Sequence, residues 1–303
     1  MSAHLTVLQR TNMDGFPKAG EMIEITGAHE LEASDRAILN LLYQHAHDSG
    51  RMGERDAEWT MPLSRLRFAA SHKGNERVLD SLKRILRTVV MVPILEPATG
   101  EPAYLLTHLF EFFTLPVAET DPRALVRFGL PQKLQPVLAR SNRWGRIKAE
   151  VVCAMTSKYA IGLYELIQLR ANMDRCIETF PVARFRELLG VPPDAYEQGT
   201  DLAKRVVEPA VLEVNGLTDM GVQIEMVRRH ARAPVTAISV TWWRKEGDEF
   251  RAVMRERNGS KMGRMARLCS QIEVAAPASS RLSPTTEVKP ASKGLDLFSD
   301  DDG

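Results

Sequence analysis

The sequence predicts an α+β fold made of two similar domains in tandem. Residues 60–67 read TMPLSRLR and residues 179–186 read TFPVARFR, so Thr, Pro and both Arg recur at an offset of 119 residues. Each copy lies within the same predicted order of elements: a helix, a short strand, a helix, a longer helix and a β-hairpin. The length of 303 residues also suits two domains better than one.

The first half provides each element of this order. Residues 33–47 predict a helix capped by Ser34 or Asp35, and TMPLSRLR predicts a short strand followed by a helix. Residues 72–90 carry apolar side chains with a period of 3.6, which indicates a third helix. Two apolar runs, 89–95 and 103–113, flank the turn residues PATGEP and predict a hairpin.

The second half repeats the plan. Ser157 is expected to cap a helix over 157–172, the strand CIETF follows, and a helix from Pro181 ends at Gly190. A longer helix over 200–216 contains Pro209, which removes one hydrogen bond and is expected to bend it. MGVQIEMV and VTAISVTWW flank the loop RRHARAP and predict a second hairpin.

This order of elements is that of the winged-helix variant of the helix-turn-helix, whose third helix enters the DNA major groove while the hairpin loop contacts the backbone. SLKRIL (81–86) aligns with LAKRVV (202–207) and extends the repeat into the third helix. The guanidinium and ammonium groups of this region suit contacts to guanine and phosphate. Arg184 and Arg186, by contrast, are expected to be scaffold or phosphate contacts. The predicted DNA-binding residues are Lys204, Arg205, Asn215, Arg228, Arg229 and Arg232 in the second half, and Lys73, Arg77, Lys83, Arg84 and Arg87 in the first.

Four stretches together resemble the iteron-binding plasmid replication initiators of the Rep_3 superfamily (RepA/RepE-like). They are SKYAIGLYELIQL, FRELLGVP, LAKRVVEPAVLEVN and RRHARAPVTAISV. The resemblance is clear from about Leu125 to Trp243 and weaker from Glu30 to Leu115. The chain departs from the usual Gly-Arg-Lys of the wing, because Ala231, Arg232 and Ala233 stand there.

The resemblance implies two winged-helix domains related by pseudo-two-fold symmetry. The C-terminal domain would be the main reader of direct repeats in double-stranded origin DNA, and the N-terminal domain would contact DNA secondarily and form dimers. Monomers would initiate replication with host proteins such as the initiator and helicase, and dimers would repress the chain's own gene. Lys204 and Arg205 would lie on the second recognition helix, with Arg229 and Arg232 on its wing.

The predicted boundaries follow from these assignments. A flexible N-terminus covers 1–20, the first winged-helix domain 21–140 and the second 141–256. A basic amphipathic helix over 257–272 is expected to pack on the second domain through Met262, Met265, Ala266, Cys269 and Ile272.

The tail over 273–303 is rich in Ser, Pro and Thr, is acidic and is expected to be disordered. Its GLDLF segment resembles the short peptide by which bacterial proteins bind the sliding clamp, with matches at Leu295, Asp296, Leu297 and Phe298.

Other classes of protein have little support in the sequence. No apolar run is long enough for a membrane span, and three scattered cysteines suit a reduced, cytoplasmic bacterial protein. We expect neither a cofactor nor a metal, and no enzymatic activity, since no phosphate-binding loop or zinc-finger spacing occurs. Two alternatives remain open, a dimeric winged-helix transcriptional repressor and a nicking initiator enzyme. The second would need a His-hydrophobic-His site, for which HAH (45–47) is the nearest match.

Overall fold

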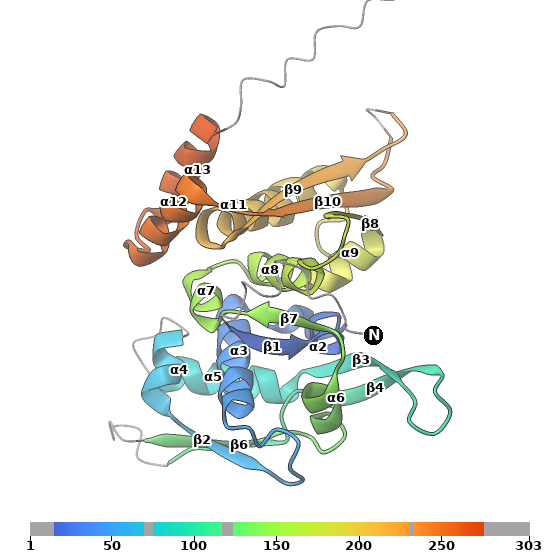
Figure 1. Cartoon of the computed structure of the whole chain (residues 1–303), viewed down its shortest axis with the longest axis vertical. Helices are drawn as coiled ribbons and strands as arrows, with labels where there is room; N and C mark the ends of the chain where they lie inside the picture. The colour runs from blue at the N-terminus through green and yellow to red at the C-terminus, as the bar shows by residue number, and fades with distance from the viewer. Residues whose placement is uncertain (1–14, 70–74, 117–123, 231–232, 276–303) are drawn as a thin grey trace, which may run out of the picture.

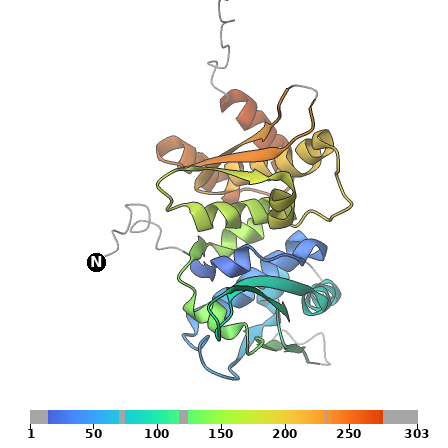
Figure 2. The ribbon, with the colours of Figure 1, turned by 90° about the vertical axis from the view of Figure 1, so that its right-hand side faces the viewer.

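The computed structural model describes residues 15–69, 75–116, 124–230 and 233–275. Two winged-helix units are stacked along the long axis, domain 1 below and domain 2 above (Figure 1). The predicted fold class is confirmed, because each unit has the expected order of helices, strand and hairpin. Both hairpins project from the same side of the molecule, the side that faces the viewer in Figure 2. The predicted flexible residues before Gly15 and the tail after Ala275 lie outside the described residues.

Domain 1 is built around α3, whose Ile38 and Leu42 are fully buried. The helix begins with a reciprocal capping box between Glu32 and Asp35, rather than with Ser34 or Asp35 as its cap. The elements of this domain are β1 (Phe16–Ala19), α2 (Gly20–Ile23), η1 (Ala28–Glu30), α3 (Ala33–Asp48), β2 (Glu58–Pro62), α4 (Leu63–Ala69), α5 (Asn75–Arg87), β3 (Val89–Leu95), β4 (Pro102–His108), β5 (Phe112–Thr114), β6 (Leu125–Gly129) and α6 (Gln135–Arg140).

Domain 2 follows the predicted plan closely. Ser157 caps α8 by accepting a hydrogen bond from the backbone of Ala160, and α9 ends at Gly190, whose φ of 72° suits glycine. The elements of this part of the chain are β7 (Trp144–Ile147), α7 (Ala149–Ala154), α8 (Lys158–Arg170), β8 (Ile177–Pro181), α9 (Val182–Leu189), α10 (Gly199–Leu202), η2 (Ala203–Val207), α11 (Glu208–Leu217), β9 (Met220–Val227), β10 (Ala237–Arg244), α12 (Gly247–Asn258) and α13 (Arg264–Ala275).

The two domains differ in their sheets, and one predicted strand is wrong. In domain 2 the strand β8 joins the hairpin in the order β8-β10-β9, whereas in domain 1 the corresponding β2 pairs with β6 in the order β2-β6-β5. The run predicted as one strand over 103–113 breaks after His108, and its last residues enter β5. Aromatic packing explains the break, since Phe110 stacks on Tyr43 at 5.3 Å and meets Phe128 edge-on at 5.6 Å inside the domain.

The predicted flexible N-terminus, residues 1–20, extends too far, because its last residues belong to a strand. Residues 16–19 form β1, which pairs antiparallel with β7 in the register Phe16↔Ile147. A side chain at Gly145 in β7 would meet the backbone nitrogen of Leu169 at 2.8 Å, so this ribbon packs directly on α8. Strands β1 and β7 therefore form one layer between the two units (Figure 1).

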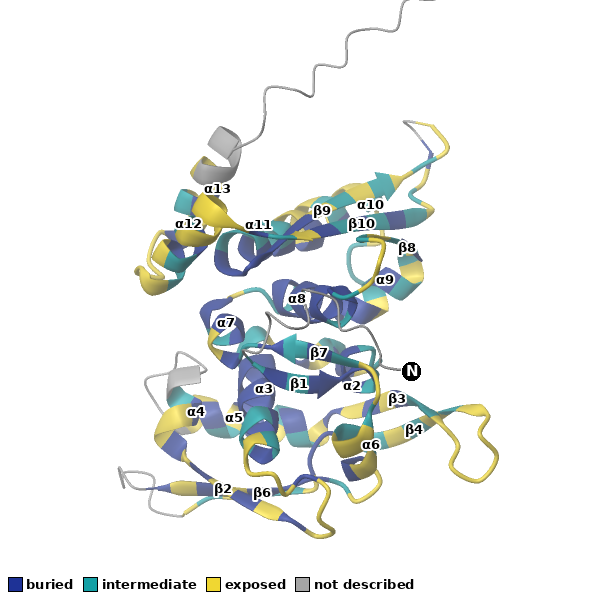
Figure 3. Ribbon diagram, viewed as in Figure 1, coloured by how far each residue is buried: buried dark blue, intermediate teal, exposed yellow. Residues whose placement is uncertain are grey.

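Helix α8 is buried along most of its length (Figure 3) and carries a buried polar cluster. Lys18 donates to Glu165 at 2.7 Å, and Asn40 donates to the same carboxylate oxygen at 2.8 Å. Burial lowers the pKa of Lys18, and the adjacent Glu165 opposes that change. Because Lys18 and Asn40 come from domain 1 and Glu165 from α8, this cluster fastens the two domains together.

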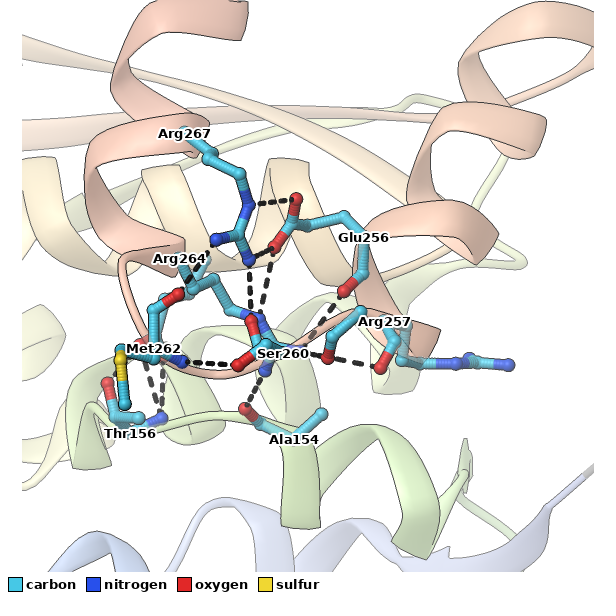
Figure 4. A network of polar contacts seen from close by, with 10 residues as sticks. Ala154, Thr156, Glu256, Arg257, Ser260, Met262, Arg264 and Arg267 are labelled. Atoms are coloured by element: carbon cyan, nitrogen blue, oxygen red, sulfur yellow. Dashed lines mark hydrogen bonds and ion pairs between the residues drawn. The ribbon is translucent and has the colours of Figure 1, made fainter.

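The structure has two C-terminal helices, α12 and α13, in place of the one predicted over 257–272, and α13 packs on domain 2 through another face than the apolar one expected. Arg264 is buried and donates to the Ala154 carbonyl at 3.0 Å, while Arg267 pairs with Glu256 at 2.6 Å (Figure 4). Leu268 is the buried apolar contact and lies against Gly216. The ion pairs thus turn the arginine face inward. Four members of the predicted apolar face, Met262, Met265, Ala266 and Cys269, are exposed, and the side chain of Ile272 lies outside the described part.

Glu213→Ala is expected to lower the free energy of unfolding by about 3 kcal/mol. The buried Glu213 carboxylate accepts hydrogen bonds from the backbone nitrogens of Thr156 and Ser157 at 3.0–3.1 Å, at the N-terminus of α8. Denaturant titration measures the change. The exposed Glu208 on the same helix is the control, and equal losses for Glu208→Ala and Glu213→Ala would contradict this role.

Candidate nucleic-acid interface

The recognition element of domain 2 runs from α10 through η2 into α11 and contains one π-helical turn. The Glu208 backbone nitrogen donates to the Ala203 carbonyl, five residues earlier. Pro209 follows immediately and has no N–H to offer, and its ring would crowd the carbonyl four residues before it. A widened turn relieves that crowding. The proline therefore accounts for the π turn that holds residues 203–207.

Lys204 and Arg205 project from this π turn into solvent. The turn is anchored from beneath by Val206 and Val207, which are buried in the core. Among the described residues, neither Lys204 nor Arg205 takes part in an ion pair, so both charges are available to a ligand. A phosphate-binding surface requires cations that are exposed and that no acidic side chain already pairs with.

The wing brings further positive charge to the same end of the recognition element. Arg229 is exposed just after β9, and Arg228 is half-buried. The guanidinium of Arg228 lies near the start of α10, where an added Cβ on Gly199 would be 3.3 Å from it. The wing therefore lies beside the start of the recognition element. We call Lys204, Arg205, Arg228 and Arg229 the basic cluster.

Asn215 and Arg84 are half-buried, and groups of their own domains engage both of them. The Asn215 amide donates to the Val222 carbonyl at 3.0 Å and accepts from the Val222 nitrogen at 2.8 Å, which ties α11 to β9. Arg84 binds the buried carboxylate of Asp35 through two nitrogens at 2.8 and 2.9 Å. Both predicted DNA contacts are therefore corrected to contacts within their own domains, because hydrogen-bonding groups that are already paired have little left for a base edge.

The predicted alignment of SLKRIL with LAKRVV is wrong, because the two segments lie at different distances from their hairpins. Lys204 lies sixteen residues before Met220, the first residue of β9, whereas Lys83 lies only six residues before Val89, the first residue of β3. By this measure Arg84 corresponds to Asn215, and both residues brace the end of their helix. Arg77, Lys83 and Arg87 are exposed on α5 and remain candidates for DNA contact. The predicted residues Lys73, Arg232, Leu295, Asp296, Leu297 and Phe298 lie outside the described residues.

Of the two predicted roles of Arg186, the structure shows the scaffold one, although the sequence did not show which groups it would hold. Its guanidinium donates to the carbonyls of Tyr196 at 2.7 Å, Pro192 at 3.1 Å and Pro193 at 3.3 Å, and to that of Ala195. The loop between α9 and α10 therefore closes around one cation, which leaves Arg186 no role as a phosphate contact. The two adjacent prolines were the available signal, since they leave carbonyls without their own helical partners.

Neither histidine of HAH is arranged for catalysis. His45 contacts the Thr60 carbonyl at 2.8 Å, and His47 contacts Asp48 at 3.3 Å. Within the part of the chain that the structure describes, no group of three or more His, Cys, Asp and Glu side chains could hold a metal ion. The helices of that same part include none with the length and apolar character needed to cross a membrane.

Comparison with known proteins defines the class of this interface. The family model described as "Initiator Rep protein, WH2" matches residues 181–242, from the end of β8 to β10, and thus contains the whole recognition element and wing. Residues 181–242 therefore resemble the second winged-helix domain of the initiator Rep proteins, and the predicted resemblance to plasmid replication initiators is confirmed.

A solved structure extends the comparison to both domains. It is described as "Crystal structure of Pi initiator protein in complex with iteron DNA" and superposes with a TM-score of 0.56 at 12% identity, over 76% of this chain and 97% of that chain. At this identity the likeness establishes a shared fold. No curated protein matches the chain significantly by sequence.

Proposed function

We propose that this protein initiates plasmid replication by binding direct repeats at an origin, without enzymatic activity of its own. The observation that carries the proposal is the basic cluster, which lies inside the segment that matches the Rep initiator domain. The Pi initiator, which shares the fold, binds iteron DNA according to its description. We further propose that domain 1 makes a secondary contact through Arg77, Lys83 and Arg87, so that the two domains follow the DNA about one helical turn apart.

Origin opening would then come from strain in the bound DNA and from recruited host proteins such as the initiator and helicase. A cytoplasmic location follows from this role. The two alternative functions make different predictions. A palindromic site without direct repeats in the DNA beside the gene would favour a transcriptional repressor. A covalent adduct between a tyrosine and nicked DNA would establish a nicking enzyme.

Replacing Lys204 and Arg205 together with Ala is expected to weaken repeat binding by about 2–4 kcal/mol, about 30- to 1,000-fold in Kd. The slope of log Kd against log salt concentration should also fall by about one unit for each phosphate that the variant no longer neutralises. Titration of DNA from beside the gene at several salt concentrations measures both. Lys83→Ala is the comparison, and a loss of affinity as large as that of the double variant would overturn the assignment of domain 2 as the main reader.

The hairpin of domain 1 supports the proposal of a dimer. Its outward face is apolar, and Tyr104 and Leu106 of β4 are 70% and 67% exposed. On the other strand, Met91 exchanges two backbone hydrogen bonds with Thr26, so β3 is covered on its outer side. Within the described residues β4 pairs only with β3. An apolar strand with an open edge is suited to pairing with the same edge of a second copy across a two-fold axis.

Such a dimer would repress the chain's own gene, while the monomer would serve initiation. Tyr104→Ser combined with Leu106→Ser is expected to raise the dimer dissociation constant by about tenfold or more. Analytical ultracentrifugation measures it. The exposed Ile177 of domain 2 provides the control Ile177→Ser, which should leave the constant unchanged. An undiminished dimer in the double variant would place the interface elsewhere.

We also propose that the tail binds the sliding clamp through Leu295, Asp296, Leu297 and Phe298. Support comes from the sequence, because an isolated apolar cluster among acidic residues can dock into a hydrophobic groove. Capture of purified clamp by the full chain should be lost when Leu297 and Phe298 are both replaced with Ala. Capture at the wild-type level would refute the idea, and Lys289→Ala in the same tail is the control.

A further inference from the structure

We propose that Arg36 of domain 1 is a positioning residue for DNA reading by domain 2. It would hold the turn between α9 and α10 in place, and so fix the helical phase between the two parts of the DNA that the domains contact. This inference rests on the proposed function. None of the residues that carry it belongs to the basic cluster.

The Arg36 guanidinium lies against the end of α9, across the domain boundary. A Cβ on Gly190 would be only 2.3 Å from its terminal nitrogen, so any larger residue there would displace the guanidinium from its present position. Arg36 is 8% exposed and donates to the Ala28 carbonyl at 3.4 Å. A cation at the C-terminal end of a helix interacts favourably with the partial negative charge there. Gly190 itself has a φ of 72°, which marks the point where the chain leaves α9 for the turn.

A second contact joins domain 1 to the same turn through the start of α8. Lys158 donates to the carbonyl of His29 in domain 1 at 2.6 Å, and its ammonium lies 5.4 Å from the centre of the Tyr159 ring. The Tyr159 ring in turn meets Tyr196 edge-on, with centroids 6.5 Å apart. Tyr196 has a φ of 57°, which is uncommon for a residue other than glycine and requires support from its surroundings.

Inside the turn, Arg186 completes the connection. The same Tyr196 presents its carbonyl to Arg186, which also gathers the carbonyls of Pro192, Pro193 and Ala195. The turn is therefore held by Arg36 of domain 1 at its start, by Tyr159 of α8 at Tyr196, and by the Arg186 guanidinium between them. Three residues after Tyr196 the chain enters α10, and Lys204 and Arg205 follow in the next helical turn.

Three other contacts between the domains hold the body of α8 and the first turn of α9. Lys18 and Arg170 bind Glu165 and Glu24 respectively, and Arg184 of α9 donates to the Glu24 carbonyl at 3.4 Å. Loss of Arg36 should therefore leave the domains attached and loosen the turn that leads into the recognition element. A rigid link between two DNA contacts makes binding depend on their phase, and a looser link makes that dependence weaker.

The experiment uses the full chain and duplexes that carry the footprinted repeat, with five or ten base pairs inserted between the parts that the two domains protect. Five base pairs are about half a helical turn and ten about a whole one. For the wild type, the five-base-pair insertion should weaken binding by about tenfold relative to the ten-base-pair insertion. In Arg36→Met the same ratio should fall below about threefold.

Gly190→Asn tests the contact from the other side. Asparagine tolerates positive φ, but its side chain would displace the Arg36 guanidinium, and we expect the same flattened ratio. The control is Arg127→Met, because Arg127 pairs with Glu58 within domain 1 and is exposed. Thermal unfolding shows which variants are folded at the assay temperature.

The outcomes distinguish failure of the proposed function from failure of the proposed role of Arg36. No binding of the intact repeat by the wild type would defeat the proposed function. Normal binding with an unchanged phase ratio in folded Arg36→Met and Gly190→Asn would defeat the inference alone. Failure of both variants to fold would also overturn it, since the contact would then serve folding rather than phase.

Discussion

The buried ion pair between Lys18 and Glu165 is the interaction on which the arrangement of the two domains depends. Both charges are removed from water, and each is tolerable only because the other, together with Asn40, satisfies it. Separation of the domains would leave the Lys18 ammonium and the Glu165 carboxylate without their ion-pair partners. The buried apolar residues of both domains also belong to one continuous cluster, so the chain behaves as one packed body with two projecting hairpins.

Within that body, local chemistry decides where charge is displayed. Pro209 removes a donor from the recognition helix, the helix widens before it, and Lys204 and Arg205 sit on the widened turn. Arg186 and Arg36, by contrast, are not available to a ligand. Backbone carbonyls accept hydrogen bonds from Arg186, and Arg36 lies against the C-terminal end of α9. Arginines of similar appearance in the sequence are thus divided between ligand binding and support by the number of oxygen acceptors within reach.

The duplicated plan was predictable, because apolar spacing, capping residues and turn residues all act within a few positions along the chain. The order of helices and hairpins, the cap at Ser157 and the stop at Gly190 follow from such local signals. The candidate site was predictable in part: Lys204, Arg205 and Arg229 are exposed as expected. The sequence did not distinguish Asn215 and Arg84 from these exposed residues. Their partners, Val222 for Asn215 and Asp35 for Arg84, come near them only in the tertiary fold.

By itself the sequence determined that this protein has two winged-helix units and that one of them resembles the reading domain of replication initiators. Periodicity and short motifs suffice for that, because helices and hairpins are set by neighbours along the chain. Only the tertiary structure decided that β2 leaves the hairpin of domain 1, that β1 returns to pair with β7, and that Arg36 lies on Gly190 of the other domain. These features depend on burying apolar surface and pairing charges between segments far apart in the chain. A local sequence pattern does not show which distant segments will come into contact.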